Sequence, residues 1–505
     1  MSVRVPLLFL FFLSSLMLSA QTGMEELCGT VGRSPFIDAY QSGKIAPVPK
    51  SGATRFVPIH LTLLGDDDGR GYADPLTVLQ SLELLNEDFN KLDLHFYIDQ
   101  DIDYLNSSAY YDHEFSGGRD LMRNYNRNAV VNNYVVGGAA GACGYYSGSG
   151  DGIVLDLDCI NGTDRTWSHE VGHYFGLPHT FFGWESKESI KNVDAFDRPA
   201  PETLSLNGRS VQVEKVDGSN CTTAADGFCD TPPDYLPERW RCNEEGVYPD
   251  SLLDPDSTRF SVSAENIMSY SFDGCVENFS PEQITAMNTN LSGRIGLSRD
   301  QVPAFAAADP SDVKLLAPAE DETAEYANEV TLRWNRVPNA HLYLVQLHLS
   351  QNFLGSVTTT FFTSDTMAVI RDILEPNLRY YWRVRPINRY DVSGDFSNFA
   401  RFRNGATENT TTATMDAALN AAVSLGPNPV AAGRELQLRG TNTGNGELTL
   451  HLFDASGRAV RTYPGQQVAG AWTATLPTDG LSPGFYSLRV GLNGRMVTRR
   501  VVVAP

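Results

Sequence analysis

Hydrophobic and polar residues follow two different periods in the first part of the chain, up to about residue 300. The run Arg55–Leu64 (RFVPIHLTLL) is rich in β-formers and largely alternates, which predicts a β-strand. The run Asp74–Asn90 has apolar residues at helical spacing behind Asp74-Pro75, which predicts an amphipathic helix capped by Asp74. Further strands are predicted at 95–98, 129–136 and 153–157, further helices at 166–177 and 281–291, and a glycine-rich loop at 137–152.

The pattern changes after about residue 310. Short alternating runs separated by turn residues extend over 312–404 and again over 423–505, and each predicts an all-β sandwich. The segment 405–422 between them is rich in Thr, Ala and Asn, which is typical of a linker. Together with the helices and strands of 52–300, the pattern predicts an α+β domain followed by two all-β sandwich domains.

The first twenty residues have the order of a secretory signal peptide. Arg4 precedes the apolar run 5–17, and Leu18-Ser19-Ala20 supplies the small residues of a cleavage site. This run is too short to span a membrane with margin, and no later segment is long and apolar enough to do so. We therefore expect an exported protein without a transmembrane segment, with a signal peptide at 1–20 and a short pro-segment at 21–51.

The overall charge excludes one class of partner. Lys and Arg number 39 and Asp and Glu number 61, so the net charge is −22. A protein that binds nucleic acid through phosphate contacts needs a basic face, so we expect no nucleic-acid partner. The chain also has seven cysteines, an odd number, so that at least one thiol is left over if the others pair after export.

The strongest chemical signal is the sequence HEVGHYFGLPH from His169 to His179. His169 and His173 are four residues apart and share one face of a helix, where both can bind one metal ion. Glu170 can reach a water at the metal, and Gly176 can end the helix and turn the chain so that His179 returns as a third ligand. Three protein ligands with an open fourth position are typical of catalytic zinc, with Glu170 as general base.

A second motif, Asn266–Tyr270 (NIMSY), follows well downstream. With the histidine motif it resembles the metzincin metallopeptidases, in which a methionine-containing turn follows the extended zinc motif. The resemblance implies an α/β metzincin catalytic domain with a zinc helix and a Met-turn. It also implies that Met268 lies beneath the histidines and that Tyr270 hydrogen-bonds the oxyanion during peptide cleavage.

Within the metzincins the chain resembles the pappalysin group, the ulilysin-like peptidases. Four segments within about residues 28–292 carry the resemblance: Cys28-Gly29-Thr30, Trp167-Ser168, Cys229-Asp230-Thr231-Pro232, and NIMSY with Cys275 beyond it. The resemblance implies a secreted endopeptidase with protein or peptide substrates, made as a latent zymogen. It also implies a preference for a basic residue after the cleaved bond, and Asp273 is the candidate for the base of that pocket.

Cys28 is separated from the other six cysteines by more than a hundred residues. A thiolate is a strong zinc ligand, so Cys28 in a detachable segment can fill the open coordination position and hold the enzyme latent. The alternative is a free thiol or an incidental disulfide, and the family resemblance favours the cysteine switch.

The other six cysteines can pair within the first domain. Cys143 and Cys159 flank the glycine-rich segment and the strand after it, so a local bridge is expected. Cys221, Cys229, Cys242 and Cys275 allow three pairings, among which the sequence does not choose. The family resemblance favours Cys221–Cys242 and Cys229–Cys275.

An irregular acidic loop follows the zinc motif. Hard oxygen donors in such a loop suit Ca²⁺, although ordinary Asx-turns would also explain them. Pappalysin relatives bind calcium near this place, so the resemblance favours a calcium site with the ligand candidates Asp226, Asp230, Thr231 and Asp234.

The two C-terminal units resemble known β modules. Trp334 and the strand around Tyr381-Trp382 are similar to the core of a fibronectin type III domain, for which a spacer or a substrate- or glycan-contacting module are the two interpretations. Residues 423–505 resemble the C-terminal sorting domain of type IX secretion, on the segments PNP at 427–429, LFDASGR at 452–458 and LSPGFYSLRV at 481–490. The resemblance implies the type IX secretion machinery as a partner, and a protein released or held at the outer cell surface of a Bacteroidota-type bacterium.

Two functions from different classes remain. The first is a secreted zinc metalloendopeptidase with a catalytic zinc, a structural calcium and a latent precursor. The alternative is a cell-surface binding or adhesion protein whose metallopeptidase domain no longer turns over. Intact Glu170 and Tyr270 favour the first.

Overall fold

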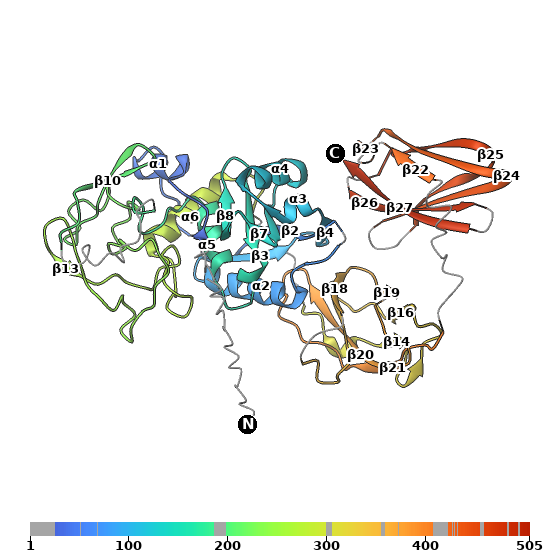
Figure 1. The fold of residues 1–505 in the computed structure, drawn as a ribbon. Coiled ribbons are helices and arrows are strands. Elements are labelled where there is room, and N and C mark those ends of the chain that lie inside the picture. The colour runs from blue at the N-terminus through green and yellow to red at the C-terminus, as the bar shows by residue number, and fades with distance from the viewer. Residues whose placement is uncertain are drawn as a thin grey trace, which may run out of the picture.

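The computed structural model shows a chain that is mostly β-sheet with few helices (Figure 1). It describes residues 26–504 apart from 51, 68, 186–197, 299–305, 355–358, 372, 408–422, 427, 429, 432, 455–458, 482–483 and 493–494. The predicted signal peptide at 1–20 and most of the predicted linker at 405–422 therefore lie outside the described residues. No helix in the described part of the chain is long and apolar enough to cross a membrane.

A nine-stranded sheet organises the N-terminal domain, which we define as residues 26–298 (Figure 1). Its main path runs in the order β3 (Leu94–Ile98), β2 (Arg55–Gly65), β6 (Val131–Val136), β9 (Gly152–Asp156), β8 (Ala142–Ser147), β7 (Gly138–Ala139) and β5 (Asp112–His113). Strand β4 (Asp103–Asn106) also pairs with β2, and β1 (Glu26–Cys28) pairs with β8. β3, β2, β6 and β9 run parallel to one another, whereas β8 is antiparallel to β9.

The glycine-rich segment 137–152 is not the loop that its composition predicted, because it contains β7 and β8. Gly144 in β8 faces the helix that carries the histidines, and a Cβ there would lie 2.9 Å from Thr166 Cγ2 and 3.1 Å from Glu170 Cγ. At this position glycine therefore permits the close approach of strand and helix rather than a turn.

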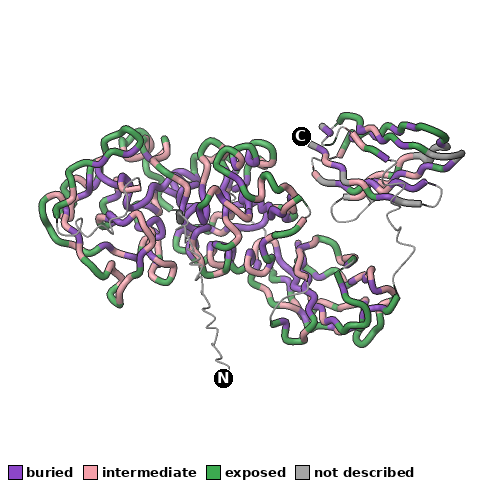
Figure 2. Tube along the Cα trace, in the orientation of Figure 1, coloured by how far each residue is buried: buried purple, intermediate pink, exposed green. Residues whose placement is uncertain are grey.

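The helices pack around this sheet. They are α1 (Pro35–Gln41), α2 (Pro75–Asn90), α3 (Ser108–Tyr111), α4 (Phe115–Tyr125), α5 (Thr166–Tyr174) and α6 (Pro281–Gly293), with short 3₁₀ turns at Leu157–Cys159 and Pro310–Asp312. Asp74 caps α2 as predicted, because its side chain accepts a hydrogen bond from the Leu76 amide. Every residue of α5 is buried, and the buried residues of Figure 2 are densest around this helix and the central sheet.

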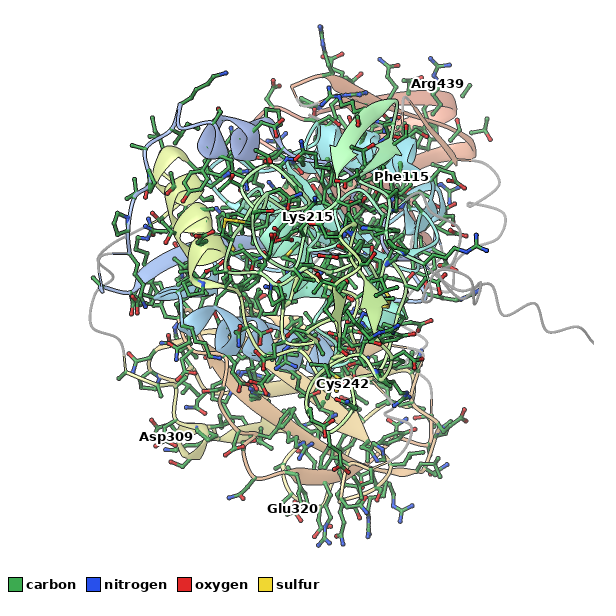
Figure 3. The ribbon with its side chains drawn as sticks, turned by 90° about the vertical axis from the view of Figure 1, so that its left-hand side faces the viewer. Phe115, Lys215, Cys242, Asp309, Glu320 and Arg439 are labelled. Carbon is green, nitrogen blue, oxygen red and sulfur yellow. A yellow bond between two sulfur atoms is a disulfide. The ribbon has the colours of Figure 1, made fainter. Side chains whose placement is uncertain are left out.

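An irregular segment at 198–276 covers one end of the domain and faces the viewer in Figure 3, where Lys215 and Cys242 are labelled. It contains two small antiparallel ribbons, β10 (Thr203–Leu206) with β11 (Arg209–Gln212), and β12 (Leu252–Leu253) with β13 (Arg259–Phe260). Its own cluster of buried side chains includes Tyr235, Trp240 and Val262.

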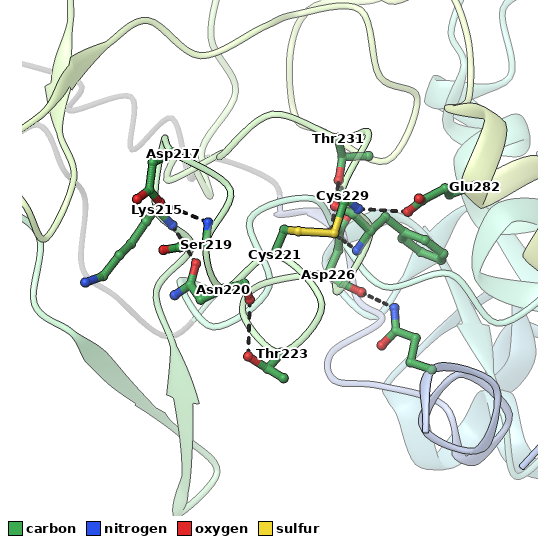
Figure 4. Close-up of a disulfide and its surroundings, with 12 residues drawn as sticks. Lys215, Asp217, Ser219, Asn220, Cys221, Thr223, Asp226, Cys229, Thr231 and Glu282 are labelled. Atoms are coloured by element: carbon green, nitrogen blue, oxygen red, sulfur yellow. Dashed lines mark hydrogen bonds between the residues drawn. A yellow bond between two sulfur atoms is a disulfide. The ribbon is translucent and has the colours of Figure 1, made fainter. Parts of the chain in front are cut away.

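The disulfides of this segment differ from the pairing that the resemblance favoured. Cys143–Cys159 forms as expected, but the other bridges are Cys221–Cys229, shown in Figure 4, and Cys242–Cys275. Cys221 and Cys229 close a tight loop that brings their Cα atoms within 5.0 Å. For the other pair, backbone hydrogen bonds from Trp240 to Tyr270 and from Phe272 to Trp240 lay the two strands of chain side by side, so that Cys242 meets Cys275.

The second unit, the sandwich domain (306–407), has two sheets. One contains β14 (Leu315–Ala317), β16 (Glu329–Trp334) and β19 (Met367–Arg371), and the other contains β15 (Glu322–Thr323), β21 (Ala400–Arg403), β20 (Arg379–Asn388), β17 (Ala340–His348) and β18 (Thr359–Thr363). Trp334 and Trp382 are buried between them, as the sequence predicted for a two-sheet core, and Tyr343 is buried with them.

The sandwich domain also packs directly on the N-terminal domain. Along β17, Tyr343 and Val345 face the sandwich core, whereas the alternate residues Leu342 and Leu344 belong to the same buried cluster as the N-terminal domain. At this interface the Arg385 guanidinium lies 2.8 Å from the Glu83 carboxylate. The interface between the two domains is part of one continuous hydrophobic core. A loosely tethered spacer would not need such an interface.

The third unit, the C-terminal domain (423–504), contains one six-stranded sheet with a separate core. The strands are β22 (Val423–Gly426), β23 (Val430–Ala431), β24 (Glu435–Asp454), β25 (Ala459–Pro477), β26 (Gly484–Leu492) and β27 (Arg495–Ala504). Most neighbours are antiparallel, and only β23 runs parallel to its partner β27.

Candidate metal centre

Helix α5 and the turn after it bring three imidazoles together. His173 Nε2 lies 3.1 Å from His169 Nε2 and 3.2 Å from His179 Nε2. Cys28 Sγ belongs to the same group, in which all four potential ligand atoms lie within 4.8 Å of one another and all four residues are buried. The three predicted histidines and the predicted cysteine therefore converge on one point.

Each imidazole ring is held in its orientation by a contact of Nδ1, the nitrogen that faces away from the centre. Nδ1 of His169 lies 2.7 Å from the Ile267 carbonyl, and Nδ1 of His173 lies 2.7 Å from the Leu177 carbonyl. A carbonyl can only accept, so Nδ1 of each of these two rings donates and Nε2 is left with its lone pair facing the centre. His179 Nδ1 lies 3.4 Å from Glu185 Oε1, which supports the same tautomer.

The centre has the properties of a cation site. Burial, followed by the neighbouring His179, lowers the pKa of His169 to about 3, and burial lowers the pKa of His173 well below its usual range. Neutral rings whose lone pairs point at one another at these distances lack a donor between them. A metal ion that accepts nitrogen ligands satisfies all three, so the residues present fit the expected group.

Two positions of the motif require glycine, each for a different structural reason. Gly176 has φ +98°, which turns the chain after α5 and returns His179 to the centre. Gly172 lies against Met268, and a Cβ there would come within 2.4 Å of the Met268 sulfur. The fully buried Met268 thus packs directly against the helix that carries the histidines.

Glu170 is fully buried beside the three rings. Its Oε2 accepts a hydrogen bond of 3.2 Å from the Thr30 hydroxyl, while Oε1 accepts none from the described residues. Burial raises the pKa of Glu170 to about 8. A buried carboxylate oxygen without a partner is an acceptor that a further donor, such as a water molecule, would satisfy.

Residues 26–30 place Cys28 at the centre. β1 pairs in parallel with β8, and the Gly29 amide donates to the Gly144 carbonyl at 2.8 Å. Burial, and then the charge of Glu170, raises the pKa of the Cys28 thiol well above its usual value. A cation at the histidines would offset this penalty by favouring the thiolate.

Tyr270 packs against the histidine rings and contacts the segment that carries Cys28. Its hydroxyl donates to the Cys28 carbonyl at 3.2 Å, and its ring centroid lies 5.1 Å from that of His179 and 4.5 Å from that of Phe181. The predicted oxyanion residue therefore lies next to the predicted metal ligands, and its hydroxyl points at the backbone of Cys28.

The four predicted calcium ligands do not form one group. Thr231 Oγ1 bonds both carboxylate oxygens of Asp226 at 3.0 Å, whereas Asp230 accepts from the Ser280 hydroxyl and the Glu282 amide and thus caps α6. Asp234 accepts from Thr180 and Ser269 beneath the centre. Figure 4 shows Asp226 and Thr231 beside the Cys221–Cys229 bridge.

A further buried acid, for which the sequence gave no signal, lies near them. Glu214 is 3% exposed, and burial, followed by the charges of Asp226 and Asp234, raises its pKa to about 9. Burial also raises the pKa of Asp226 to about 8. Glu214, Asp226 and Asp234 form a buried acidic cluster, in which a hard cation would relieve the mutual repulsion.

Asp273 lies in a pocket beside the centre, as predicted, but its carboxylate already has partners. Oδ1 accepts from the Arg165 amide at 2.9 Å, and Oδ2 pairs with the Arg239 guanidinium. The pocket is lined by residues from the start of α5 and from the segment around Met268, including His169, Ile267, Tyr270, Val276, Asp273 and Arg239. The sequence showed Asp273 but gave no signal for Arg239, which lies 34 positions earlier.

Comparison with known proteins gives distant relatives. The chain is 26% identical over 316 residues to "Extracellular metalloprotease 1" of Coccidioides posadasii, which spans 57% of this chain and 97% of that protein. It is 24% identical over 319 residues to "Extracellular metalloprotease" of Pyricularia oryzae, again 57% of this chain and 97% of that protein. No protein-family model matches the sequence.

Solved structures with a likeness to parts of the chain include fibronectin type III-like modules. FN3tt has 18% identity and a TM-score of 0.15, over 20% of this chain and 99% of that one. The fibronectin(III)-like modules of Clostridium thermocellum CbhA have 9% identity and a TM-score of 0.15, over 38% of this chain and 93% of those modules.

Proposed function

We propose that the protein is a secreted, zinc-dependent endopeptidase that is made as a latent precursor. The observation that carries the proposal is the convergence of His169, His173 and His179 with Cys28, next to the buried carboxylate of Glu170. The similarity to proteins named extracellular metalloproteases supports it independently.

The residues of the centre have complementary roles in this proposal. Zinc held by the three histidines supplies Lewis-acid chemistry toward water and the peptide carbonyl. Glu170 takes the proton of the attacking water and returns it to the leaving amine. The Tyr270 hydroxyl donates to the carbonyl oxygen as that oxygen gains negative charge.

Latency follows from the segment that now fills the centre. Cys28 would supply the fourth ligand to zinc, the Thr30 hydroxyl contacts Glu170, and the Cys28 carbonyl accepts from Tyr270. Each group needed for cleavage is thus engaged by residues 28–30. In this proposal, activation removes this stretch from β8, which leaves a strand edge for an extended substrate peptide.

Finer assignments belong to the same proposal. The centre is of the metzincin type and closest to the pappalysins, calcium binds at the buried acidic cluster around Asp226, and the 423–505 unit is a type IX sorting domain that directs export. A preference for a basic residue after the cleaved bond would rest on Asp273, which pairs with Arg239.

A casein assay tests the proposed function directly. After proteolytic removal of the pro-segment, the protein should cleave casein, and a zinc chelator should abolish that cleavage. An adhesion protein with a silent centre would leave casein intact under both conditions.

A further inference from the structure

The third histidine of the centre is held in a different way from the other two. His169 and His173 lie on α5, and Nδ1 of each is 2.7 Å from a backbone carbonyl. His179 lies beyond the turn at Gly176, and its Nδ1 contact with Glu185 is longer, at 3.4 Å. The position of His179 therefore depends on the chain segment that carries it.

A buried carboxylate ties that segment to a second segment of the centre. Asp234 is 2% exposed, and its Oδ2 accepts from the Thr180 hydroxyl at 2.6 Å and from the Ser269 hydroxyl at 2.8 Å. Thr180 directly follows His179, and Ser269 directly precedes Tyr270. One oxygen of Asp234 thus connects the turn of the third histidine with the residue next to Tyr270.

Backbone contacts run alongside this connection. The Thr180 amide donates to the Met268 carbonyl at 3.2 Å, and the Trp240 amide donates to the Tyr270 carbonyl at 3.3 Å. The chain from Asp234 to Trp240 therefore lies along the stretch that carries Tyr270 and contacts it at both ends. Asp234 adds a side-chain contact at the point where the two turns meet.

The three donors around Asp234 leave this connection little freedom. Its Oδ1 accepts from the Leu236 amide at 2.9 Å, in addition to the two hydroxyls on Oδ2. Each hydroxyl has one proton, and Thr180 and Ser269 both direct theirs at the carboxylate. An alternative acceptor for Thr180 is the Met268 carbonyl at 3.5 Å, which is too far for a strong bond. A buried network whose members are all satisfied is rigid, so it can fix the relative position of the two turns.

We infer that Asp234 is a positioning residue of the metal centre. Through the Thr180 hydroxyl it holds His179 in place, and through the Ser269 hydroxyl it holds Tyr270 beside the histidines. The sequence grouped Asp234 with the calcium ligands, whereas its contacts give it a role at the histidines. The inference goes beyond the proposed function, which assigns Asp234 no such role, and its kinetic test rests on that function.

The zinc affinity of the uncut precursor tests the position of His179 without any cleavage reaction. It is measured by competition with a chromophoric chelator. Thr180→Val removes the hydroxyl and should weaken zinc binding by about 10–100-fold, the usual cost of losing a partner that orients a metal ligand. Thr180→Ser keeps the hydroxyl and should bind zinc as the native protein does. Native affinity in Thr180→Val would overturn the inference.

Asp234→Asn should weaken zinc binding to a similar extent, because an amide cannot accept at both ends and would set its NH₂ group against the hydroxyls or the Leu236 amide. Asp254→Asn is the matched control. Asp254 is 1% exposed in the same irregular segment and accepts from the Val216 and Thr258 amides. Its change should lower the Tm but leave zinc affinity unchanged. An equal loss of zinc affinity in both variants would show a general effect of buried carboxylates and overturn the inference.

A kinetic cycle with Tyr270→Phe tests the second contact in the activated enzyme. Ser269→Ala should lower kcat for casein by about 10–100-fold with little change in KM. In the Tyr270→Phe background the same change should lower kcat by a much smaller factor, because the hydroxyl that Ser269 helps to position is absent. A merely structural role would lower kcat by the same factor in both backgrounds, and that result would overturn the positioning of Tyr270.

The inference and the proposed function fail in different ways. If the activated native protein leaves casein intact while zinc affinity falls in Thr180→Val but not in Thr180→Ser, the proposed function is wrong and the role of Asp234 at the histidines stands. If the native protein cleaves casein and Thr180→Val binds zinc as tightly as the native protein, Asp234 is not a positioning residue and the endopeptidase stands.

Discussion

The hydroxyl of Thr30 lies 3.2 Å from the carboxylate of Glu170, across 140 positions of sequence, and shares its one proton between that carboxylate and the Tyr146 carbonyl, which is also 3.2 Å away. The cysteine switch that the sequence predicts therefore has a second contact, on the proposed base rather than on the metal. An intramolecular hydrogen bond contributes about 0.5–1.5 kcal/mol, so this contact adds to latency.

We expect Cys28→Ala and Thr30→Val to weaken latency in different degrees. Cys28→Ala should allow the uncut precursor to cleave casein, and Thr30→Val should raise precursor activity by about tenfold. Precursor integrity is checked by mass spectrometry during the assay.

Val31→Ala is the matched control for both changes, because Val31 is 54% exposed in the same segment. It should leave precursor activity at the native level. Equal activity in Thr30→Val and Val31→Ala would contradict the second contact, and equal activity in Cys28→Ala would contradict the switch.

Calcium should stabilise the protein through Asp226. In the metal-free protein burial raises the pKa of Asp226 from 3.8 to about 8, so the folded state holds this proton more tightly than the unfolded chain. The resulting stability is present below the unfolded pKa and is lost as the pH rises through about 8. Bound calcium would take the place of the proton, so the increase in Tm on adding calcium should grow as the pH is raised from about 4 to 8.

Asp226→Asn should remove most of that calcium-dependent increase, as measured by thermal melts with calcium and with a chelator. Asp217→Asn, an exposed change in the same irregular segment, should retain it. If calcium shifts the Tm of Asp226→Asn as much as that of the native protein, Asp226 is not a ligand.

The sandwich domain should unfold together with the N-terminal domain. Leu344 is fully buried in the cluster shared by the two, so Leu344→Ala should cost about 2–5 kcal/mol and lower the temperature of their common calorimetric transition. Leu316→Ala is the control, because Leu316 is 52% exposed on the same domain and should change the Tm little. Separate transitions for the two domains in the native protein would show that the interface does not couple them.

Local sequence signals predicted the parts of the centre that depend on local spacing. The four-residue interval from His169 to His173 and the positive φ of Gly176 are properties of one helix and one turn, and the structure places them as expected. The glycine-rich segment 137–152 was wrongly predicted to be a loop. Gly144 is required there because a side chain would collide with Glu170, and not because its backbone needs a turn conformation.

The sequence did not predict contacts between residues that are far apart along the chain, because these contacts depend on the tertiary fold. Nothing near Arg239 indicates that the folded chain pairs it with Asp273, and nothing near Glu214 marks it as a neighbour of Asp226. The choice between disulfide pairings likewise depends on where the backbone at Trp240 runs beside Phe272, which is a tertiary contact.

The central claim is that three histidines hold zinc while Glu170 moves the proton. Activated Glu170→Ala should retain about one zinc per chain by metal analysis, while its casein cleavage falls by about 10²–10⁴-fold, the usual contribution of a general acid–base residue. Glu265→Ala, an exposed change beside the Met-turn, should keep both zinc and activity. Chelator-sensitive cleavage at the native rate by zinc-loaded Glu170→Ala would contradict the account.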